Sequence, residues 1–198
     1  NSKLLELFFD FGLVPLGNNL QSDHQKSLLV EAFPLAIYRC KSCNHYQLGV
    51  SVDPNLLYAT NYTYLSSIGK SFLNHLNAYS HWAFNKGLFD CSSFVVDIGS
   101  NDGSCLAAFK SLGAKVLGID PAQLPAKIAN QNGIPTINSF FGDSVVEEIL
   151  SQHGQADYIT SHNVLAHIHD LNSTFKNIYR LLKNNGYFVF EIGYFKNV

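Results

Sequence analysis

The chain has 198 residues, of which 46% are hydrophobic and 14% are charged, and its formal net charge is −2. This length can bury one ordinary core and a small appended module, and the composition excludes a disordered chain. The small negative charge gives no electrostatic basis for binding nucleic acid. The sequence has no apolar run of the ~20 residues that a membrane span needs and no signal peptide pattern. With four cysteines and no secretory context, we expect a cytoplasmic protein.

The first part of the chain, up to about residue 90, does not repeat a strand–helix pattern. Residues 11–19 contain two glycines and a proline, which indicate an irregular, turn-rich loop. Two short strands are expected around 35–39 and 46–50. From 69 to 84, apolar residues recur at the spacing of a helix, which predicts a helix linking this part to the rest.

Strands and helices alternate in the second part of the chain. The expected strands are 94–98, 115–119, 135–139, 157–161 and 187–192, and the expected helices are 103–112, 122–132, 143–152 and 171–183. This alternation predicts a doubly wound, Rossmann-like α/β sheet of parallel strands, which binds ligands at the carboxyl ends of the strands. We therefore divide the chain into an N-terminal module (1–68), a linking helix (69–90) and a core domain (91–198).

The segment 95–103, VVDIGSNDG, is the most informative stretch of the chain. It predicts a buried strand that runs into a glycine-rich turn, where Gly99 and Gly103 would let a ligand approach the backbone. The spacing of these glycines matches neither the dinucleotide fingerprint nor a P-loop. Two carboxylates, Asp97 and Asp102, would repel a pyrophosphate but suit a ligand with an ammonium or sulfonium group.

This Asp-x-Gly-x-x-x-Gly pattern resembles motif I of class I S-adenosylmethionine-dependent methyltransferases, in which the loop holds the methionine part of the cofactor. A second acid, Asp120, ends the next expected strand. In nucleotide-binding α/β folds an acid at that position accepts hydrogen bonds from ribose hydroxyls. Asp120 can also cap the helix expected to begin at Pro121, and the two roles are compatible.

Cys40 and Cys43 form a Cys-x-x-Cys pair between the two expected short strands. Such a pair supplies two of the four ligands of a structural zinc site. A redox pair is an alternative, although it usually opens a helix in a thioredoxin-like unit. An unligated turn is another alternative. Because the sequence has no second pair, we expect half of a Zn²⁺ site, with the other half upstream of Asn1 and His45 as a fallback ligand.

Other polar and aromatic residues are expected near the ligand. Phe141 follows the third expected strand and would either stack on an adenine or pack in the core. Asn163 and His167 follow the fourth strand, and His167 would act as an acid, a base or an orienting donor unless it has only a structural role. The hydroxyl-rich segment 58–67 would face a sugar or phosphate, or pack between modules.

Taken together, these motifs resemble those of one family. In chain order they are Pro15-Leu16-x-Asn18, Cys40-x-x-Cys43, Tyr62-x-Tyr64-x-Ser66, Asp97-Ile98-Gly99-Ser100-Asn101-Asp102-Gly103 and Asn163-Val164-Leu165-Ala166-His167. Over nearly its whole length, the chain resembles the zinc-containing sugar C-methyltransferases of the NDP-hexose 3-C-methyltransferase type. Those enzymes have a small zinc-binding domain, a central methyltransferase domain and a further C-terminal domain. The resemblance implies methyl transfer from S-adenosylmethionine to carbon 3 of a nucleotide-linked 4-keto-deoxysugar.

The resemblance also implies roles for individual residues. It assigns Asp97, Gly99, Ser100, Asp102, Gly103, Asp120, Phe141 and Asn163 to the cofactor, Asn163 and His167 to the reacting centre, Tyr62, Tyr64 and Ser66 to the sugar nucleotide, and Cys40 and Cys43 to Zn²⁺. Within that set, Asp120 faces the ribose and Phe141 the adenine. The family's Tyr-His-Glu-His motif, which carries the base, would lie beyond residue 198, so the resemblance implies a fragment.

Two other functions are compatible with the same residues. A methyltransferase that acts on an oxygen or nitrogen of another small metabolite would need no strong base for a carbon acid. A non-catalytic module that binds S-adenosylmethionine or a nucleotide sugar would need only the binding residues. An NAD-dependent oxidoreductase is disfavoured by the glycine spacing of the loop.

Overall fold

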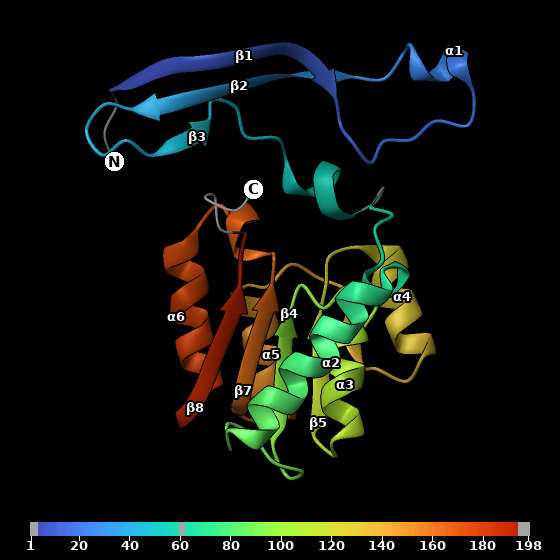
Figure 1. The fold of residues 1–198 in the computed structure, drawn as a ribbon, viewed down its shortest axis with the longest axis vertical. Helices are drawn as coiled ribbons and strands as arrows, with labels where there is room; N and C mark the ends of the chain where they lie inside the picture. The colour runs from blue at the N-terminus through green and yellow to red at the C-terminus, as the bar shows by residue number, and fades with distance from the viewer. Residues whose placement is uncertain (1–3, 60–61, 194–198) are drawn as a thin grey trace. The chain divides into compact units, whose positions relative to one another are not determined.

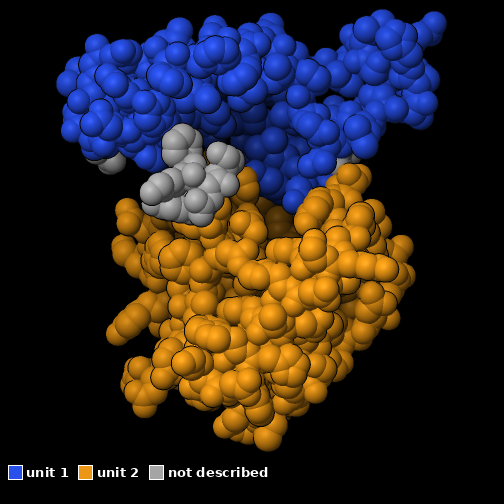
Figure 2. Space-filling view, viewed as in Figure 1, with its two compact units in different colours: residues 1–62 blue, residues 63–198 orange. Residues whose placement is uncertain are grey.

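The computed structural model describes residues 4–59 and 62–193. The chain forms two compact units, residues 1–62 and residues 63–198, which Figure 2 shows in different colours. The first unit is built on an antiparallel sheet and the second on a parallel sheet. The expected linking helix belongs to the second unit, where it packs against the first helix of the core.

The first unit contains a three-stranded sheet with the order β1-β2-β3. Its elements are β1 (Leu5–Pro15), α1 (His24–Ser27), β2 (Ala32–Cys40), β3 (Tyr46–Leu48) and the π-helical turn η1 (Asn55–Ala59) (Figure 1). The Asp23 side chain caps α1 by accepting a hydrogen bond from Lys26 N at 2.8 Å. β2 and β3 confirm the two short strands predicted around Cys40 and Cys43.

The structure corrects the prediction of an irregular loop at 11–19 for residues 11–15, which belong to β1, whereas residues 16–19 form a turn as predicted. Residues as far as Pro15 pair with β2. The pairing shifts register between Asp10 and Leu13, where Gly12 has φ +76° and donates its amide hydrogen to Asp10 Oδ1 at 2.8 Å. The glycine therefore lies in a β-bulge, which takes up an extra residue without ending the strand.

The second unit contains a parallel five-stranded sheet with the order β6-β5-β4-β7-β8 (Figure 1). Its elements are η2 (Ser66–Ile68), α2 (Lys70–Asn85), β4 (Phe94–Ile98), α3 (Ser104–Ser111), β5 (Lys115–Ile119), α4 (Gln123–Gln131), β6 (Thr136–Ile137), α5 (Asp143–Gln152), β7 (Ala156–His162), η3 (Leu165–His167), α6 (Leu171–Leu181) and β8 (Leu182–Glu191). The chain enters at the central strand and winds outward in both directions. This is the doubly wound, Rossmann-like arrangement that the sequence predicted.

Apolar side chains cover both faces of this sheet. On one face, Val95 and Tyr158 pack with Leu76 of α2 and Phe109 of α3. On the other face, Val96 joins a cluster to which α5 and α6 contribute. β4 is buried along its whole length, although it contains Asp97, and its predicted bounds equal the observed ones.

Gly113 and Asp170 mark helix ends as predicted, but the gap predicted before the last strand is absent. Gly113, at φ +96°, follows α3, and the Asp170 side chain caps α6 with a hydrogen bond of 3.0 Å. The predicted gap before the last strand is wrong, because α6 ends at Leu181 and β8 begins at Leu182. Residues 183–186 instead interrupt the pairing of β8 with β7 as a bulge. Within the described residues, no helix has both the length and the hydropathy to cross a membrane.

Candidate functional site

The loop that follows β4 is fastened to the end of β5 by its own backbone. Gly99 N and Ser100 N both donate hydrogen bonds to Ile119 O, at 2.8 and 3.2 Å. Asn101 N donates to Asp120 Oδ2 at 2.8 Å. These amide groups are therefore satisfied by the protein, and the side chains and the remaining edge of the loop are available to a ligand.

The glycines of this loop are required by close packing. Gly99 has φ +75°, and a Cβ added to it would lie 2.2 Å from Val164 Cγ2. Gly103 has φ +80°, and a Cβ there would lie 3.0 Å from Ile134 Cγ2. The absence of a side chain at residue 99 thus lets the loop after β7 approach the loop after β4. This packing role, which the sequence did not show, is compatible with the predicted approach of a ligand.

Asn101 and Asp102 hold the segment that precedes α2. Asn101, at φ +52°, accepts a hydrogen bond from Ser66 N at 2.9 Å and donates from Nδ2 to Tyr64 O at 3.0 Å. Asp102 Oδ2 accepts from Ser67 N at 2.9 Å. The structure therefore brings two of the predicted substrate residues, Tyr64 and Ser66, onto the glycine-rich loop.

The remaining residues of the hydroxyl-rich segment are placed differently. Tyr62 belongs to the first compact unit, whereas Tyr64 and Ser66 belong to the second. Thr60 and Asn61 lie outside the described residues. The sequence did not predict the hydrogen bonds of Asn101 to Ser66 and Tyr64. The left-handed backbone of Asn101 has a recognisable signal, because asparagine is one of the residues that adopt this conformation in turns.

Three acids lie at the carboxyl ends of β4 and β5. Asp97 is 2% exposed, and its Oδ1 has no hydrogen-bond partner among the described residues. Burial raises the pKa of Asp97 well above its usual value, and the nearby Asp120 raises it further. Burial also raises the pKa of Asp120, although the amides of Ala122 and Asn101 oppose that shift. Asp102 accepts hydrogen bonds from Ser104 and Ser67.

The unpaired carboxyl oxygen of Asp97 has two counterparts in the same unit. Ser100 Oγ and His162 Nδ1 are also buried without a hydrogen-bond partner in the part of the chain that the structure describes. Buried polar groups without partners are uncommon in native proteins, and a bound ligand is one way to satisfy them. Of these groups, the Asp97 carboxyl and the Ser100 hydroxyl can accept hydrogen bonds from a cationic group of a small polar ligand.

Asp120 serves the turn into α4 as well as the loop. Its Oδ1 accepts a hydrogen bond from Ala122 N at 2.8 Å, just before the first residue of α4. The N-cap of α4 is Ala122 and no side chain among the described residues caps this helix, so the predicted capping of the helix by Asp120 is wrong and the carboxylate instead holds the turn that precedes it. Each carboxylate oxygen has two lone pairs, so Asp120 can still accept a hydrogen bond from a ligand.

The loop after β7 carries the predicted residues of the reacting centre. Asn163 is at φ +57°, and its amide donates to Glu191 O at 2.7 Å. His167 is exposed, at the end of the 3₁₀ turn η3. Phe141 packs against the core cluster on the α5 and α6 face, which is the core-packing alternative considered for it.

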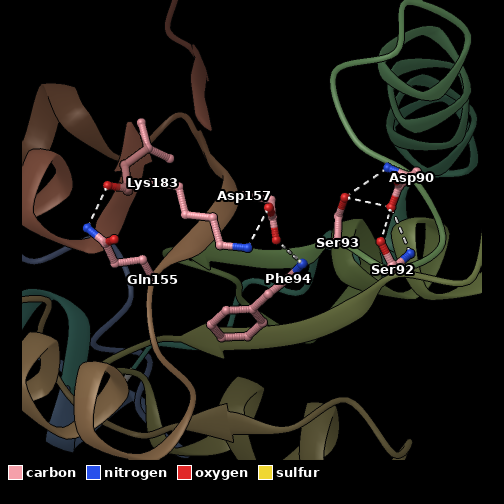
Figure 3. A network of polar contacts seen from close by, with 8 residues as sticks. Asp90, Ser92, Ser93, Phe94, Gln155, Asp157 and Lys183 are labelled. Carbon is pink, nitrogen blue, oxygen red and sulfur yellow. Dashed lines mark hydrogen bonds and ion pairs between the residues drawn. The ribbon is translucent and has the colours of Figure 1, made fainter. Parts of the chain in front are cut away.

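A depression lies at the end of the sheet opposite the glycine-rich loop. It has a volume of about 780 Å³, and its lining includes Phe94 and Lys115, the first residues of β4 and β5. Figure 3 shows Asp157 accepting hydrogen bonds there from Phe94 N, at 2.8 Å, and Lys183 Nζ, at 2.7 Å. These contacts join the starts of neighbouring strands, so we assign this network to the fold.

The cysteine pair lies on the turn between β2 and β3. Cys40 N donates to His45 O, and Asn44 N donates to Cys40 O, both at 2.8 Å. Cys40 is buried and Cys43 is exposed. Two thiols on one tight turn fit half of a tetrahedral zinc site. In residues 4–59 and 62–193, no group of three metal-ligating side chains completes it.

Two family models match the chain. A model described as "Methyltransferase domain" matches residues 76–193, and one described as "Putative zinc binding domain" matches residues 1–58. The first match begins within α2 and includes the β4 loop and all five parallel strands. The second includes both cysteines of the Cys-x-x-Cys pair.

Relatives and a solved structure agree with these matches. C-methyltransferase NovU of Streptomyces niveus is 33% identical over 93% of this chain and 44% of its own length. Ubiquinone biosynthesis O-methyltransferase of Bordetella avium (strain 197N) is 34% identical over 49% of this chain and 41% of its own length. The chain therefore spans less than half of either curated relative.

The solved structure described as a "putative" S-adenosyl-L-methionine-dependent methyltransferase from Methanococcus maripaludis shares the fold. It superposes with a TM-score of 0.53 at 22% identity, over 65% of this chain and 60% of that chain. Because the methyltransferase model matches more than half of its residues, the chain belongs to the methyltransferase domain family.

Proposed function

We propose that this chain is part of an S-adenosylmethionine-dependent C-methyltransferase that acts on a nucleotide-linked 4-keto-deoxysugar. The observation that carries the cofactor assignment is the buried, unpaired carboxyl oxygen of Asp97 at the carboxyl end of β4. The nature of the acceptor is supported by the order of motifs in the sequence and by the C-methyltransferase relative, which aligns with nearly the whole chain.

The residues of the loop fit the cofactor. Asp97 supplies a negative charge for its ammonium group, and Ser100 Oγ supplies a hydroxyl that has no other partner among the described residues. Asp120 has lone pairs left for ribose hydroxyls. Phe141 would contact the adenine from the edge of the core. When bound, S-adenosylmethionine supplies an electrophilic methyl group.

The chain also supplies groups for the acceptor. A carbon next to a ketone becomes nucleophilic when a base removes its proton, and donors must then stabilise the enolate oxygen. Asn163 and His167 are our candidates for orienting the acceptor, and Tyr62, Tyr64 and Ser66 for binding the sugar nucleotide. The hydrogen bond from Asn163 N to Glu191 O holds the Asn163 backbone, which favours a fixed position for its side chain.

We extend the proposal to the first unit, which we propose is a zinc-binding module. Cys40 and Cys43 would provide two thiolate ligands, and the other two would come from outside the described residues. In this role Zn²⁺ stabilises the fold of the module and takes no part in methyl transfer. The division into an N-terminal module (1–68), a linking helix (69–90) and a core domain (91–198) is also part of this proposal.

Calorimetry with S-adenosylhomocysteine tests the proposed function. The folded wild-type chain is expected to bind it, and Asp97→Asn is expected to weaken the binding. Asp143→Asn, an exposed acid at the start of α5, is the matched control and should bind as wild type does. Failure of the wild-type chain to bind S-adenosylhomocysteine would refute the methyltransferase assignment.

The O-methyltransferase relative supports an alternative acceptor. It aligns with about half of this chain, whereas the C-methyltransferase aligns with 93% of it. We therefore prefer carbon methylation. Titration of the S-adenosylhomocysteine complex with dTDP separates the two, because an acceptor without a nucleotide predicts no dTDP binding.

A further inference from the structure

The register of the parallel strands aligns four polar side chains on one face of the sheet, at its carboxyl end. Asp97 of β4 is level with Thr160 of β7. Two residues further along β7, His162 is level with Glu191 of β8. Side chains that are level in parallel strands share a face, as do residues two apart in one strand. The row therefore lies on the face that α2 covers, where Tyr79 contacts Thr160.

A chain of hydrogen bonds joins this row to α2, and burial sets its direction. Tyr79 Oη lies 2.6 Å from Tyr158 Oη and 2.8 Å from Thr160 Oγ1. Tyr158 is completely buried, and Tyr79 is the one hydrogen-bond partner that the described residues give its hydroxyl. Tyr158 must therefore donate to Tyr79, since its proton would otherwise be buried without an acceptor. Tyr79 in turn donates to Thr160.

This direction determines which ring nitrogen of His162 carries the proton. Thr160 is completely buried, and among the described residues its Oγ1 contacts Tyr79, from which it accepts, and His162 Nε2 at 3.0 Å, so its own proton goes to Nε2. Nε2 is then the acceptor, and the neutral ring carries its proton on Nδ1. Burial lowers the pKa of His162 despite the opposing effect of Glu191, so the neutral ring is favoured.

The carboxylate of Glu191 is hydrogen-bonded to His75 and lies near His162. Its Oε2 accepts a hydrogen bond from His75 Nε2 at 2.5 Å and lies 3.9 Å from His162 Nδ1. Within the described residues, the hydrogen bonds and ion pairs of its carboxylate involve Oε2, and the side chain is 38% exposed. Its backbone carbonyl accepts from Asn163 N, so Glu191 lies beside the loop of the proposed reacting centre, and its Oε1 has no hydrogen bond or ion pair with the described residues.

We propose that Glu191 binds a hydroxyl group of the acceptor, and that His75 and His162 position its carboxylate. This inference rests on the proposed function and adds a residue to the same site. A carboxylate oxygen accepts hydrogen bonds and repels anions, so it selects a hydroxyl-bearing ring such as a hexose. The contact is to the sugar and not to the diphosphate of a nucleotide sugar.

Titration of the S-adenosylhomocysteine complex with dTDP-glucose and, separately, with dTDP tests the role of Glu191. Glu191→Gln is expected to weaken binding of dTDP-glucose at least about tenfold, because it removes a charge-assisted hydrogen bond. Binding of dTDP and of S-adenosylhomocysteine should stay as in the wild type. Glu147→Gln, an exposed α5 acid paired with Arg180, is the control and should leave all three unchanged.

The possible outcomes separate the two proposals. Absence of S-adenosylhomocysteine binding in the wild type refutes the proposed function. If the wild type binds both ligands and Glu191→Gln binds dTDP-glucose equally well, the role of Glu191 is refuted and the proposed function stands. Loss of dTDP and S-adenosylhomocysteine binding together in Glu191→Gln, or no dTDP-glucose binding by the wild-type complex, also overturns the inference.

Nitrogen NMR of the His162 ring tests its positioning role. We expect a protonated Nδ1 and an unprotonated Nε2 in the wild type. Thr160→Val removes the donor to Nε2 and should redistribute the proton, whereas Thr160→Ser keeps the hydroxyl and should restore the wild-type signals. A proton on Nε2 in the wild type, or unchanged signals in Thr160→Val, would overturn the assignment.

Discussion

Gly99→Ala tests the contact between the loops after β4 and β7. The new Cβ would lie 2.2 Å from Val164 Cγ2, and residue 99 has φ +75°. A left-handed non-glycine residue costs about 1–2 kcal/mol, and overpacking a dense site adds about 1–3 kcal/mol. We therefore expect the free energy of unfolding of the second unit to fall by about 2–5 kcal/mol. Trp82, the single tryptophan, lies in α2 and reports this unit in urea titrations.

Gly154→Ala is the matched control for this experiment. Gly154 has φ +79°, and a Cβ there would meet nothing within 4 Å, so its loss should be confined to about 1–2 kcal/mol of backbone strain. Val164→Ala combined with Gly99→Ala should recover part of the difference. Equal losses for Gly99→Ala and Gly154→Ala would refute the packing argument.

Three further substitutions test the buried carboxyl of Asp97, the hydrogen bond between Ser66 N and Asn101, and the contact between Tyr79 and Tyr158. Asp97→Asn should stabilise the unliganded protein at neutral pH, because the raised pKa of Asp97 makes stability fall as pH rises above the usual carboxyl value. In the wild type, binding of S-adenosylhomocysteine should release protons, measured by calorimetry in buffers of different ionisation enthalpy; equal heats would contradict the assignment of an ammonium group to Asp97. Asn101→Ala should speed hydrogen exchange at the Ser66 amide, and unchanged exchange would show that the hydrogen bond from Ser66 N to Asn101 does not hold this segment. Tyr79→Phe should cost about 1–3 kcal/mol in urea unfolding, because Tyr158 loses its hydrogen-bond partner; a loss below about 0.5 kcal/mol would contradict this.

The parts of the fold predicted well are those whose pattern is set locally by burial. β4 and β5 match their predicted bounds because both are short, mainly apolar segments in the interior of the sheet. β1 was not predicted, and its second half, which continues through a glycine bulge, resembles a loop in the sequence. The start of β8 was missed for a similar reason, since the turn-forming residues 183–186 are a bulge.

The site was predictable only where a residue acts through its position in a strand or turn. Asp97 and Asp120 end adjacent strands, and the sequence placed both near a ligand. The partnership of Asn101 with Ser66 joins residues 35 positions apart and follows from tertiary contact. The meeting of His162 and Glu191 depends on the pairing register of β7 with β8, which no local pattern encodes.

Asn101 and Asp102 hold residues 64–67 by hydrogen bonds, and these bonds also determine the order in which parts of the second unit open in the native state. The backbone of Asn101 is held by Asp120, so its side chain is in place only when the ends of β4 and β5 are together. The segment 64–67 depends on that side chain and on Asp102, whereas the strand pairing does not depend on the segment. Residues 64–67 should therefore open at lower free energy than the sheet, as a small cooperative unit of their own. Tyr64 and Ser66, which we propose for binding the acceptor, would then lie in a part of this unit that opens before the sheet does.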